Sequence, residues 1–204
     1  MSDLLFVVGP AGSGKSTSSK LIARRLGAAY VDKDTVATGF TEAILALAGT
    51  DPHERDNNQY YQDHVMDLEY ETILRVATDN LALGNSVVLD APFGRYLRRD
   101  AFLTDAAARL GWGDDVRPVV VHVRVDGDAI RNRLIRRGLE RDAWKIAHWD
   151  EFWAKAGRVE CTWQGAAHVT LDNTGDAPDV EGLARQLQDP DGSAPVPGCT
   201  PPTI

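Results

Sequence analysis

The chain has 204 residues, of which 43% are hydrophobic and 25% charged, and its formal net charge is −8 at pH 7. This length and composition are typical of one soluble globular domain with a full hydrophobic core. The acidic balance argues against a dedicated nucleic-acid-binding protein, although a local basic patch on an acidic protein would still be compatible with one.

Short apolar runs alternate with longer helical patterns along the chain. The expected strands cover residues 4–8, 28–32, 86–90, 116–125 and 168–171. The expected helices cover residues 16–26, 36–48, 60–83, 97–110, 126–137, 148–156 and 180–187. Strict alternation predicts an α/β fold, a parallel sheet with helices on both faces. Pro118 weakens the start of the fourth strand.

Residues 1–188 are expected to form a single domain, and residues 189–204 a Pro/Gly-rich, disordered tail. Cys161 and Cys199 do not suggest a disulfide framework, because the second lies in that tail. The first residues lack the basic segment of a signal peptide, and no apolar run approaches a membrane span. We therefore expect a cytoplasmic protein without a membrane partner.

Residues 9–16, GPAGSGKS, match the phosphate-binding loop pattern G-x-x-x-x-G-K-[ST] at every fixed position. A buried strand precedes them and a helix follows, so backbone N–H groups and a helix N-terminus can surround an anion. The alternative is a glycine-rich turn that contains a lysine by chance. The residues expected to bind a nucleoside triphosphate are Gly9, Ala11, Gly12, Ser13, Gly14, Lys15, Ser16 and Thr17.

Within this loop, Lys15 is expected to reach the β- and γ-phosphates, and Ser16 to bind Mg²⁺. Asp90 ends the third expected strand and is the candidate second anchor of Mg²⁺, the alternative being a cap of the following turn. Ligands of parallel sheets bind at the carboxyl ends of the strands, where both residues would lie.

Asp34 follows the second expected strand and is the candidate general base, which accepts the proton of an attacking hydroxyl. The alternative is that Asp34 or Thr35 is only the N-cap of the next helix. Asp32 is expected to help position the substrate. Further candidate substrate contacts in polar loops are Tyr60, Phe93, Arg95 and Arg98, which an ordinary surface loop would explain equally well.

Arginines cluster between residues 124 and 141. They indicate a lid over residues 133–147, with Gly138 as its hinge, because phosphoryl transfer needs cationic donors and the arginine fork suits phosphate oxygens. Arg133 and Arg137 are the candidate catalytic arginines, and Arg137 and Arg141 the candidate phosphate ligands. A solvated helix face is the alternative.

With these residues assembled, the chain resembles the small P-loop kinases, a group that includes gluconate kinase, shikimate kinase, chloramphenicol phosphotransferase, zeta toxins and the kinase domain of polynucleotide kinase. The resemblance covers residues 3–188 and rests on the phosphate loop, VDKD at 31–34, VLD at 88–90 and RLIRRGLERD at 133–142. It implies a three-layer fold, a five-stranded sheet of order 2-3-1-4-5, ATP and Mg²⁺ as cofactors, and adenine resting near Asn173 and Thr174.

The substrate signatures of gluconate, shikimate and adenylylsulfate kinases are absent from the sequence, which leaves the acceptor open. The favoured function is an ATP-dependent kinase that phosphorylates a hydroxyl of a small molecule such as a sugar, a nucleoside or an antibiotic-like acceptor. The alternatives are a polynucleotide 5′-hydroxyl kinase, which the net charge disfavours, and a non-catalytic nucleotide switch. No nucleic-acid partner is expected, and the oligomeric state stays open, a homodimer included.

Overall fold

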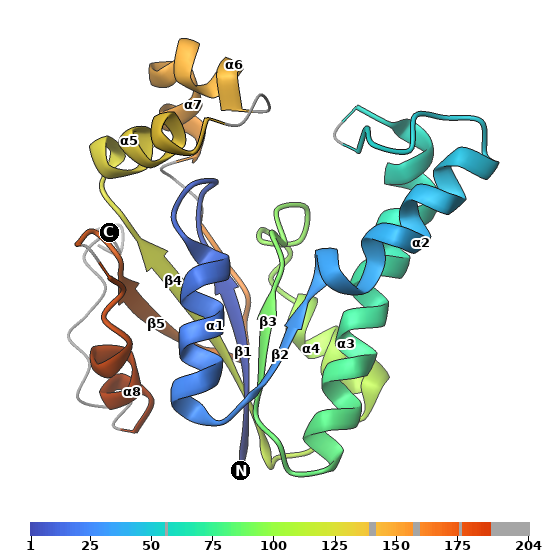
Figure 1. Cartoon of the computed structure of the whole chain (residues 1–204). Helices are drawn as coiled ribbons and strands as arrows, with labels where there is room; N and C mark the ends of the chain where they lie inside the picture. Colours follow the sequence, from blue (N-terminus) through green and yellow to red (C-terminus); the bar gives the residue numbers. More distant parts are fainter. Residues whose placement is uncertain (56, 139–141, 157–159, 176, 189–204) are drawn as a thin grey trace, which may run out of the picture.

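The computed structural model describes residues 1–55, 57–138, 142–156, 160–175 and 177–188 (Figure 1). Five parallel strands form one sheet in the order β2-β3-β1-β4-β5, which confirms the expected fold class and strand order. The strands are β1 (Ser2–Val8), β2 (Ala29–Asp32), β3 (Val87–Asp90), β4 (Val116–Arg124) and β5 (Ala167–Asp172). The expected disordered tail, residues 189–204, lies outside the described residues.

Helices alternate with the strands. They are α1 (Lys15–Leu26), α2 (Lys33–Leu47), α3 (Met66–Ala82), α4 (Phe102–Leu110), α5 (Gly127–Arg137), α6 (Ala143–Ala147), α7 (Trp149–Ala156) and α8 (Val180–Gln188). A π-helical turn, η1 (Tyr61–Val65), precedes α3. Among the described residues, no helix is long and apolar enough to cross a membrane.

The central strand β1 separates two hydrophobic layers, because successive side chains of a strand point to opposite faces. Leu4 and Phe6 pack with residues of α3 and α4, whereas Leu5 and Val7 pack with residues of α1 and α8. All four side chains are fully buried. Figure 1 shows the same division, with α1 and α8 on one side of the sheet and α3 and α4 on the other. The result is a three-layer fold.

The carboxyl ends of the three neighbouring strands β2, β3 and β1 meet at one edge of the sheet. Asp32 of β2 is in register with Asp90 of β3, which is in register with Val7 of β1. This register places the starts of α1 and α2 beside the end of β3. In Figure 1, α5, α6 and α7 stand above this edge on one side and α2 projects above it on the other.

Two helices near this edge differ from those expected. Helix α2 begins at Lys33 rather than at residue 36, because the Asp32 side chain accepts a hydrogen bond from the Asp34 amide and caps the helix. The helix expected over residues 60–83 is helical from residue 59, but the π-helical turn η1 interrupts it before α3 begins at Met66.

Helix α4 also begins later than expected, at Phe102. The preceding segment is held instead by the chain that leads into β5: the Trp163 indole donates to the Tyr96 carbonyl at 2.8 Å, and the Thr162 amide donates to the Leu97 carbonyl at 2.9 Å. These contacts between distant parts of the chain fix turns where the local pattern predicted a helix.

Two further differences lie elsewhere in the chain. Pro118 does not delay β4, which begins at Val116. At Pro118 the strand has β1 as a neighbour, but β5 pairs only from Val119 onward, so the missing N–H falls where one side of β4 is unpaired. Helix α6 lies between two expected helices, over residues where no helix was expected.

Candidate nucleotide and acceptor site

The phosphate loop joins β1 to α1 and needs glycine at two positions. Gly12 and Gly14 have φ angles of 84° and 82°, in the left-handed region that favours glycine. A Cβ at Gly14 would stand 2.6 Å from Nδ2 of Asn173, and one at Gly12 would stand 2.9 Å from Cδ2 of Leu134. The loop is therefore closely packed between α5 and the segment after β5, and its backbone path is fixed.

Lys15 is partly buried within this loop. Its ammonium donates hydrogen bonds to the carbonyls of Gly9 at 2.9 Å and Pro10 at 3.0 Å. Burial lowers the pKa of Lys15 to about 8; Asp90 opposes this effect, and the positive charges of Arg137 and Lys145 add to it. Two cations of the predicted lid therefore lie near the loop lysine, and together the three charges suit a polyphosphate.

Ser16 and Asp90, the residues predicted to bind Mg²⁺, lie close enough for the Ser16 hydroxyl to influence the Asp90 carboxylate. This carboxylate is 5% exposed and accepts a hydrogen bond from Oη of Tyr30 at 2.8 Å. Burial raises the pKa of Asp90 above its ordinary value, the Tyr30 and Ser16 hydroxyls oppose this shift, and Asp32 adds to it.

This donor set fits Mg²⁺. Among the described residues no group of three or more histidine, cysteine or acidic side chains could hold a metal. Mg²⁺ in kinase sites is bound by one or two carboxylates together with phosphate oxygens and water, so Asp90 and the Ser16 hydroxyl are a sufficient protein contribution. Sequence analysis missed Tyr30, because its contact with Asp90 depends on β2 lying beside β3.

Asp32, not Asp34 or Thr35, caps helix α2. Its carboxylate accepts from the Asp34 amide at 3.1 Å and from the Thr35 hydroxyl at 2.8 Å. The Asp34 side chain is 70% exposed and lies 3.2 Å from Nζ of Lys33 and 3.6 Å from Nη1 of Arg55. Asp34 is thus free of the capping role that was the alternative to general-base function, while Asp32 has acquired it.

Arg133 of α5 lies between the segment after β5 and the phosphate loop. Its Nη2 donates to the carbonyls of Asn173 at 2.7 Å and Gly175 at 3.1 Å. Its Nη1 is buried, has no hydrogen-bond partner among the described residues, and lies 4.0 Å from the Cβ position of Gly14. A buried guanidinium donor without a partner is costly. If Arg133 acts on the phosphates as predicted, a phosphate oxygen of a nucleotide in the loop would be that partner.

The segment after β5 holds the other side of the loop. The Asn173 side chain donates to the Ser13 carbonyl at 2.7 Å, so the residue expected beside adenine braces the loop backbone. Thr174 is exposed and lines a cavity of about 340 Å³ together with residues at the ends of β4 and β5, among them Arg124, Asp126 and Asp172. This cavity lies where the nucleotide base was expected.

Arg137 ends α5 and is held by a carboxylate that sequence analysis overlooked. Asp142 has a fully buried side chain and accepts from Nε and Nη2 of Arg137 at 2.5 and 2.8 Å, and from Nζ of Lys145 at 3.0 Å. The Arg137 hydrogen bonds hold the pKa of Asp142 near 2 against the opposing effect of burial. Gly138 follows with a φ of 62°. Arg141, a predicted phosphate ligand, lies outside the described residues.

The expected substrate residues do not form one group. The Phe93 side chain is fully buried and packs edge-on against Phe6 at a ring distance of 5.4 Å, which removes it from the surface residues available to a substrate. Arg95 donates to the Gln62 carbonyl at 2.8 Å, within the π-helical turn. Arg98 is exposed, and Tyr60 is 39% exposed and packs against the His64 ring.

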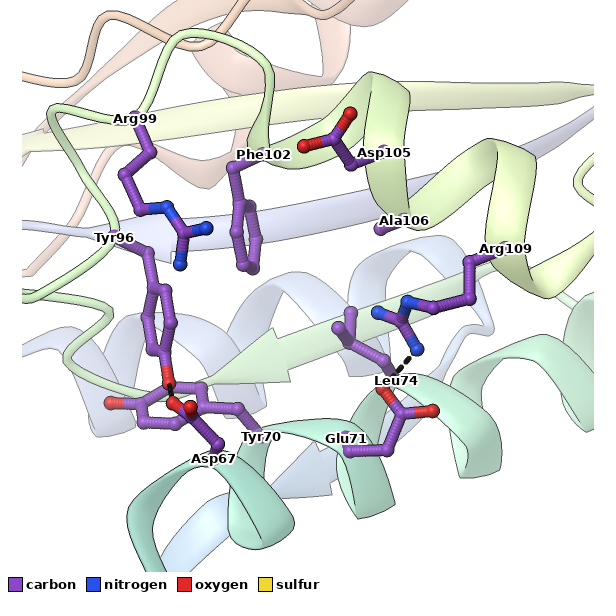
Figure 2. Close-up of a pocket in the computed structure, with 10 residues that line it drawn as sticks. All are labelled: Asp67, Tyr70, Glu71, Leu74, Tyr96, Arg99, Phe102, Asp105, Ala106 and Arg109. Atoms are coloured by element: carbon purple, nitrogen blue, oxygen red, sulfur yellow. Dashed lines mark hydrogen bonds and ion pairs between the residues drawn. The ribbon is translucent and has the colours of Figure 1, made fainter. Parts of the chain in front are cut away.

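A separate cavity of about 320 Å³ lies between α3 and α4 (Figure 2). Its polar groups largely pair with one another: Tyr96 donates to Asp67, and Arg109 contacts Glu71. Asp67 and Glu71 flank Glu69 by two residues each, so with 3.6 residues per turn they lie on the opposite side of α3 from it. Since Glu69 contacts Lys33 of α2, this cavity is distinct from the site around Asp34.

The fold has the strand order that the resemblance to the small P-loop kinases implied. A model of the AAA domain family AAA_33 matches residues 4–159, and the chain therefore belongs to this family. A search of curated proteins found no significant match.

Two solved structures of similar fold are informative. A protein from Chloroflexus aurantiacus j-10-fl with a provisional kinase assignment superposes with a TM-score of 0.60 at 17% identity, covering 92% of this chain and 98% of that one. A sugar kinase from Janibacter sp. HTCC2649 superposes with a TM-score of 0.52 at 16% identity, covering 92% of each chain. Identities this low establish the shared fold alone.

Proposed function

We propose that the protein is an ATP-dependent kinase that transfers the γ-phosphate to a hydroxyl group of a small molecule. The observation that carries the proposal is the register of Asp32 with Asp90 at the sheet edge. Asp34 follows Asp32 by two residues at the start of α2, so its exposed carboxylate belongs to the same sheet edge as the Ser16–Asp90 pair that suits Mg²⁺. A nucleotide-binding loop and an exposed carboxylate at one sheet edge are the minimum that phosphoryl transfer to an alcohol requires.

Each residue then has a physical role. Lys15 and Arg133 place positive charge against the phosphates, and Arg137 adds charge from the lid; such charge stabilises the loose transition state of phosphoryl transfer. Mg²⁺ bound between Ser16, Asp90 and the phosphates would neutralise the developing negative charge. The Asp34 carboxylate accepts the proton of the acceptor hydroxyl and orients its oxygen in line with the γ-phosphate.

The acceptor is sought first with the wild-type protein. ATP and Mg²⁺ are incubated with sugars, nucleosides, hydroxylated antibiotics and a 5′-hydroxyl oligonucleotide, and mass spectrometry detects the phosphorylated product. A phosphorylated small molecule supports the proposal. A phosphorylated oligonucleotide assigns a polynucleotide kinase instead. Slow ATP hydrolysis that no acceptor changes contradicts the proposal and favours a nucleotide switch.

Asp34→Asn tests the base role. Loss of a general base typically lowers the rate by about 10²–10⁴-fold, so we expect kcat to fall in that range while the affinity for ATP stays near wild type. Asp79→Asn, at an exposed position of α3, is the matched control and should leave both unchanged. Turnover by Asp34→Asn within a few-fold of wild type would show that Asp34 is not the base.

A further inference from the structure

A buried ion pair connects the first turn of α2 to α3 directly beside Asp34. Lys33 is 4% exposed and Glu69 is 3% exposed, and Nζ of Lys33 lies 2.7 Å from Oε2 of Glu69. Lysine and glutamate are rarely this deeply buried unless they are paired. The pair belongs neither to the phosphate loop nor to the predicted set of substrate residues, so it calls for its own explanation.

Glu69 has hydrogen-bond partners at both carboxylate oxygens. Its Oε1 accepts from the Thr41 hydroxyl at 2.5 Å, and its Oε2 accepts from Oη of Tyr61 at 2.7 Å as well as from Lys33. Burial opposes ionisation of Glu69, but the hydrogen bonds from Lys33, Thr41 and Tyr61 outweigh it and lower its pKa. Glu69 is therefore a fixed anion that is shielded from solvent.

Tyr61 reaches Glu69 from the π-helical turn. Its amide is held by the Asn58 side chain, which accepts at 3.1 Å. π-Helical turns are rare and occur frequently at functional sites. Here the irregular turn, which precedes α3, supplies the Tyr61 hydroxyl as a donor to the Glu69 carboxylate.

The outer side of this cluster faces Asp34. Nζ of Lys33 lies 3.2 Å from Oδ1 of Asp34, and Nη1 of Arg55 lies 3.6 Å from the same oxygen and 4.0 Å from Oε1 of Glu69. Arg55 also donates to the Thr38 hydroxyl at 3.2 Å. An exposed carboxylate would ordinarily sample several rotamers. Here Lys33 and Arg55, which both lie against the buried Glu69 carboxylate, hold one oxygen of the Asp34 carboxylate.

We propose that Lys33 and Glu69 are positioning residues that hold the Asp34 carboxylate in one orientation for the acceptor hydroxyl. This inference rests on the kinase function proposed above. Stability alone does not account for the pair, since a buried ion pair is often no more stabilising than well-packed apolar side chains of similar size. A role in orienting Asp34 accounts for the pair, because a misplacement of about 1 Å at a reacting group can reduce turnover by about 10²-fold.

The decisive variant removes both charges at once. Glu69→Gln alone removes the buried counter-charge of the Lys33 ammonium and leaves only the exposed Asp34 carboxylate beside it, so this variant should unfold at a clearly lower urea concentration. In the double variant K33M/E69Q neither charge is left unpaired, and the amide oxygen introduced at position 69 can still accept a hydrogen bond, so the unfolding midpoint should return toward that of wild type. A purely structural pair would regain activity together with stability.

The first measurement needs no acceptor. Three-bond NMR couplings to the Asp34 side-chain carboxyl carbon report its χ1 rotamer. We expect one rotamer in wild type and averaging in K33M/E69Q. Averaged couplings already in the wild-type protein, or unchanged couplings in the variant, would overturn the inference whether or not the protein proves to be a kinase.

The second measurement uses the acceptor found in the screen and a mutant cycle with Asp34→Asn. We expect K33M/E69Q to lower kcat by about 10–100-fold with little change in KM for ATP, and to cost almost nothing further in the Asp34→Asn background. Additive losses would show that the pair acts independently of Asp34. If the rotamer result holds but the wild-type protein phosphorylates no acceptor, the proposed function fails and the positioning of Asp34 stands.

Discussion

Replacing Gly14 by alanine should weaken both the fold and nucleotide binding. Gly14 has a φ of 82°, and an alanine Cβ would stand 2.6 Å from Nδ2 of Asn173. The left-handed backbone costs a residue with a Cβ about 1–2 kcal/mol. Asn173 must also move, and its hydrogen bond to the Ser13 carbonyl contributes about 1 kcal/mol. The expected total loss of unfolding free energy is about 2–3 kcal/mol.

Gly84→Ala is the matched control. Gly84 has nearly the same φ, 81°, but a Cβ there meets nothing within 4 Å. Urea unfolding should therefore show a loss of about 1–2 kcal/mol for this variant, smaller than that for Gly14→Ala by the cost of displacing Asn173. Calorimetry should show about tenfold weaker ATP binding for Gly14→Ala, equivalent to about 1.4 kcal/mol, and unchanged binding for Gly84→Ala.

Two results would refute this reasoning. Equal destabilisation by the two glycine variants would mean that the segment after β5 does not brace the phosphate loop. Wild-type ATP affinity in Gly14→Ala would mean that the loop path is not what binds the nucleotide. A third variant checks the cause. Asn173→Ala should cost less stability in the Gly14→Ala background than in wild type, because the hydrogen bond from Asn173 to Ser13 is already broken there.

Two further predictions concern charge in the same site. The pKa of Lys15, about 8 in the free protein, should rise when phosphates bind beside it, so ATP binding near pH 8 should take up a fraction of a proton. Calorimetry in buffers of different ionisation enthalpy should detect this uptake in wild type and not in Lys15→Met. Asp142 has a folded-state pKa of about 2, below the ordinary value of about 3.9; its contribution to stability is therefore present above pH 4 and lost as pH falls through about 2. The stability difference between wild type and Asp142→Asn, measured by urea unfolding, should shrink over that window, and a difference independent of pH would contradict the ion pair with Arg137.

The sequence was sufficient for the features that short segments specify. The phosphate loop is a local pattern, and the alternation of apolar runs with helical periods predicts a parallel sheet, because parallel strands need crossover connections. Asp90 could be placed at the site in advance, since it ends a buried strand and strand ends of a parallel sheet meet at one edge. The strand order came from the resemblance to the small P-loop kinases and is confirmed by the structure.

Helix boundaries and buried aromatic residues were less predictable. Phe93 looked like a loop aromatic available to a ligand, but its backbone φ of 51° and the packing of Trp163 at a ring distance of 5.4 Å place its side chain in the core. The first turn of α2 depended on which of several neighbouring polar residues capped it. Such choices are decided by tertiary contacts, which outweigh local preferences.

The partners of the functional groups were decided only by the tertiary structure. Lys33 and Glu69 are separated by 36 positions, Tyr30 and Asp90 by 60, and Ser13 and Asn173 by 160. A lysine between two aspartates or a glutamate in a helix carries no local sign that it will be buried and paired. The sequence alone determined that a nucleotide loop and carboxylates share one edge of a sheet. The tertiary structure decided which side chains hold those groups in place, because each such contact exists only after strands and helices distant in sequence have packed together.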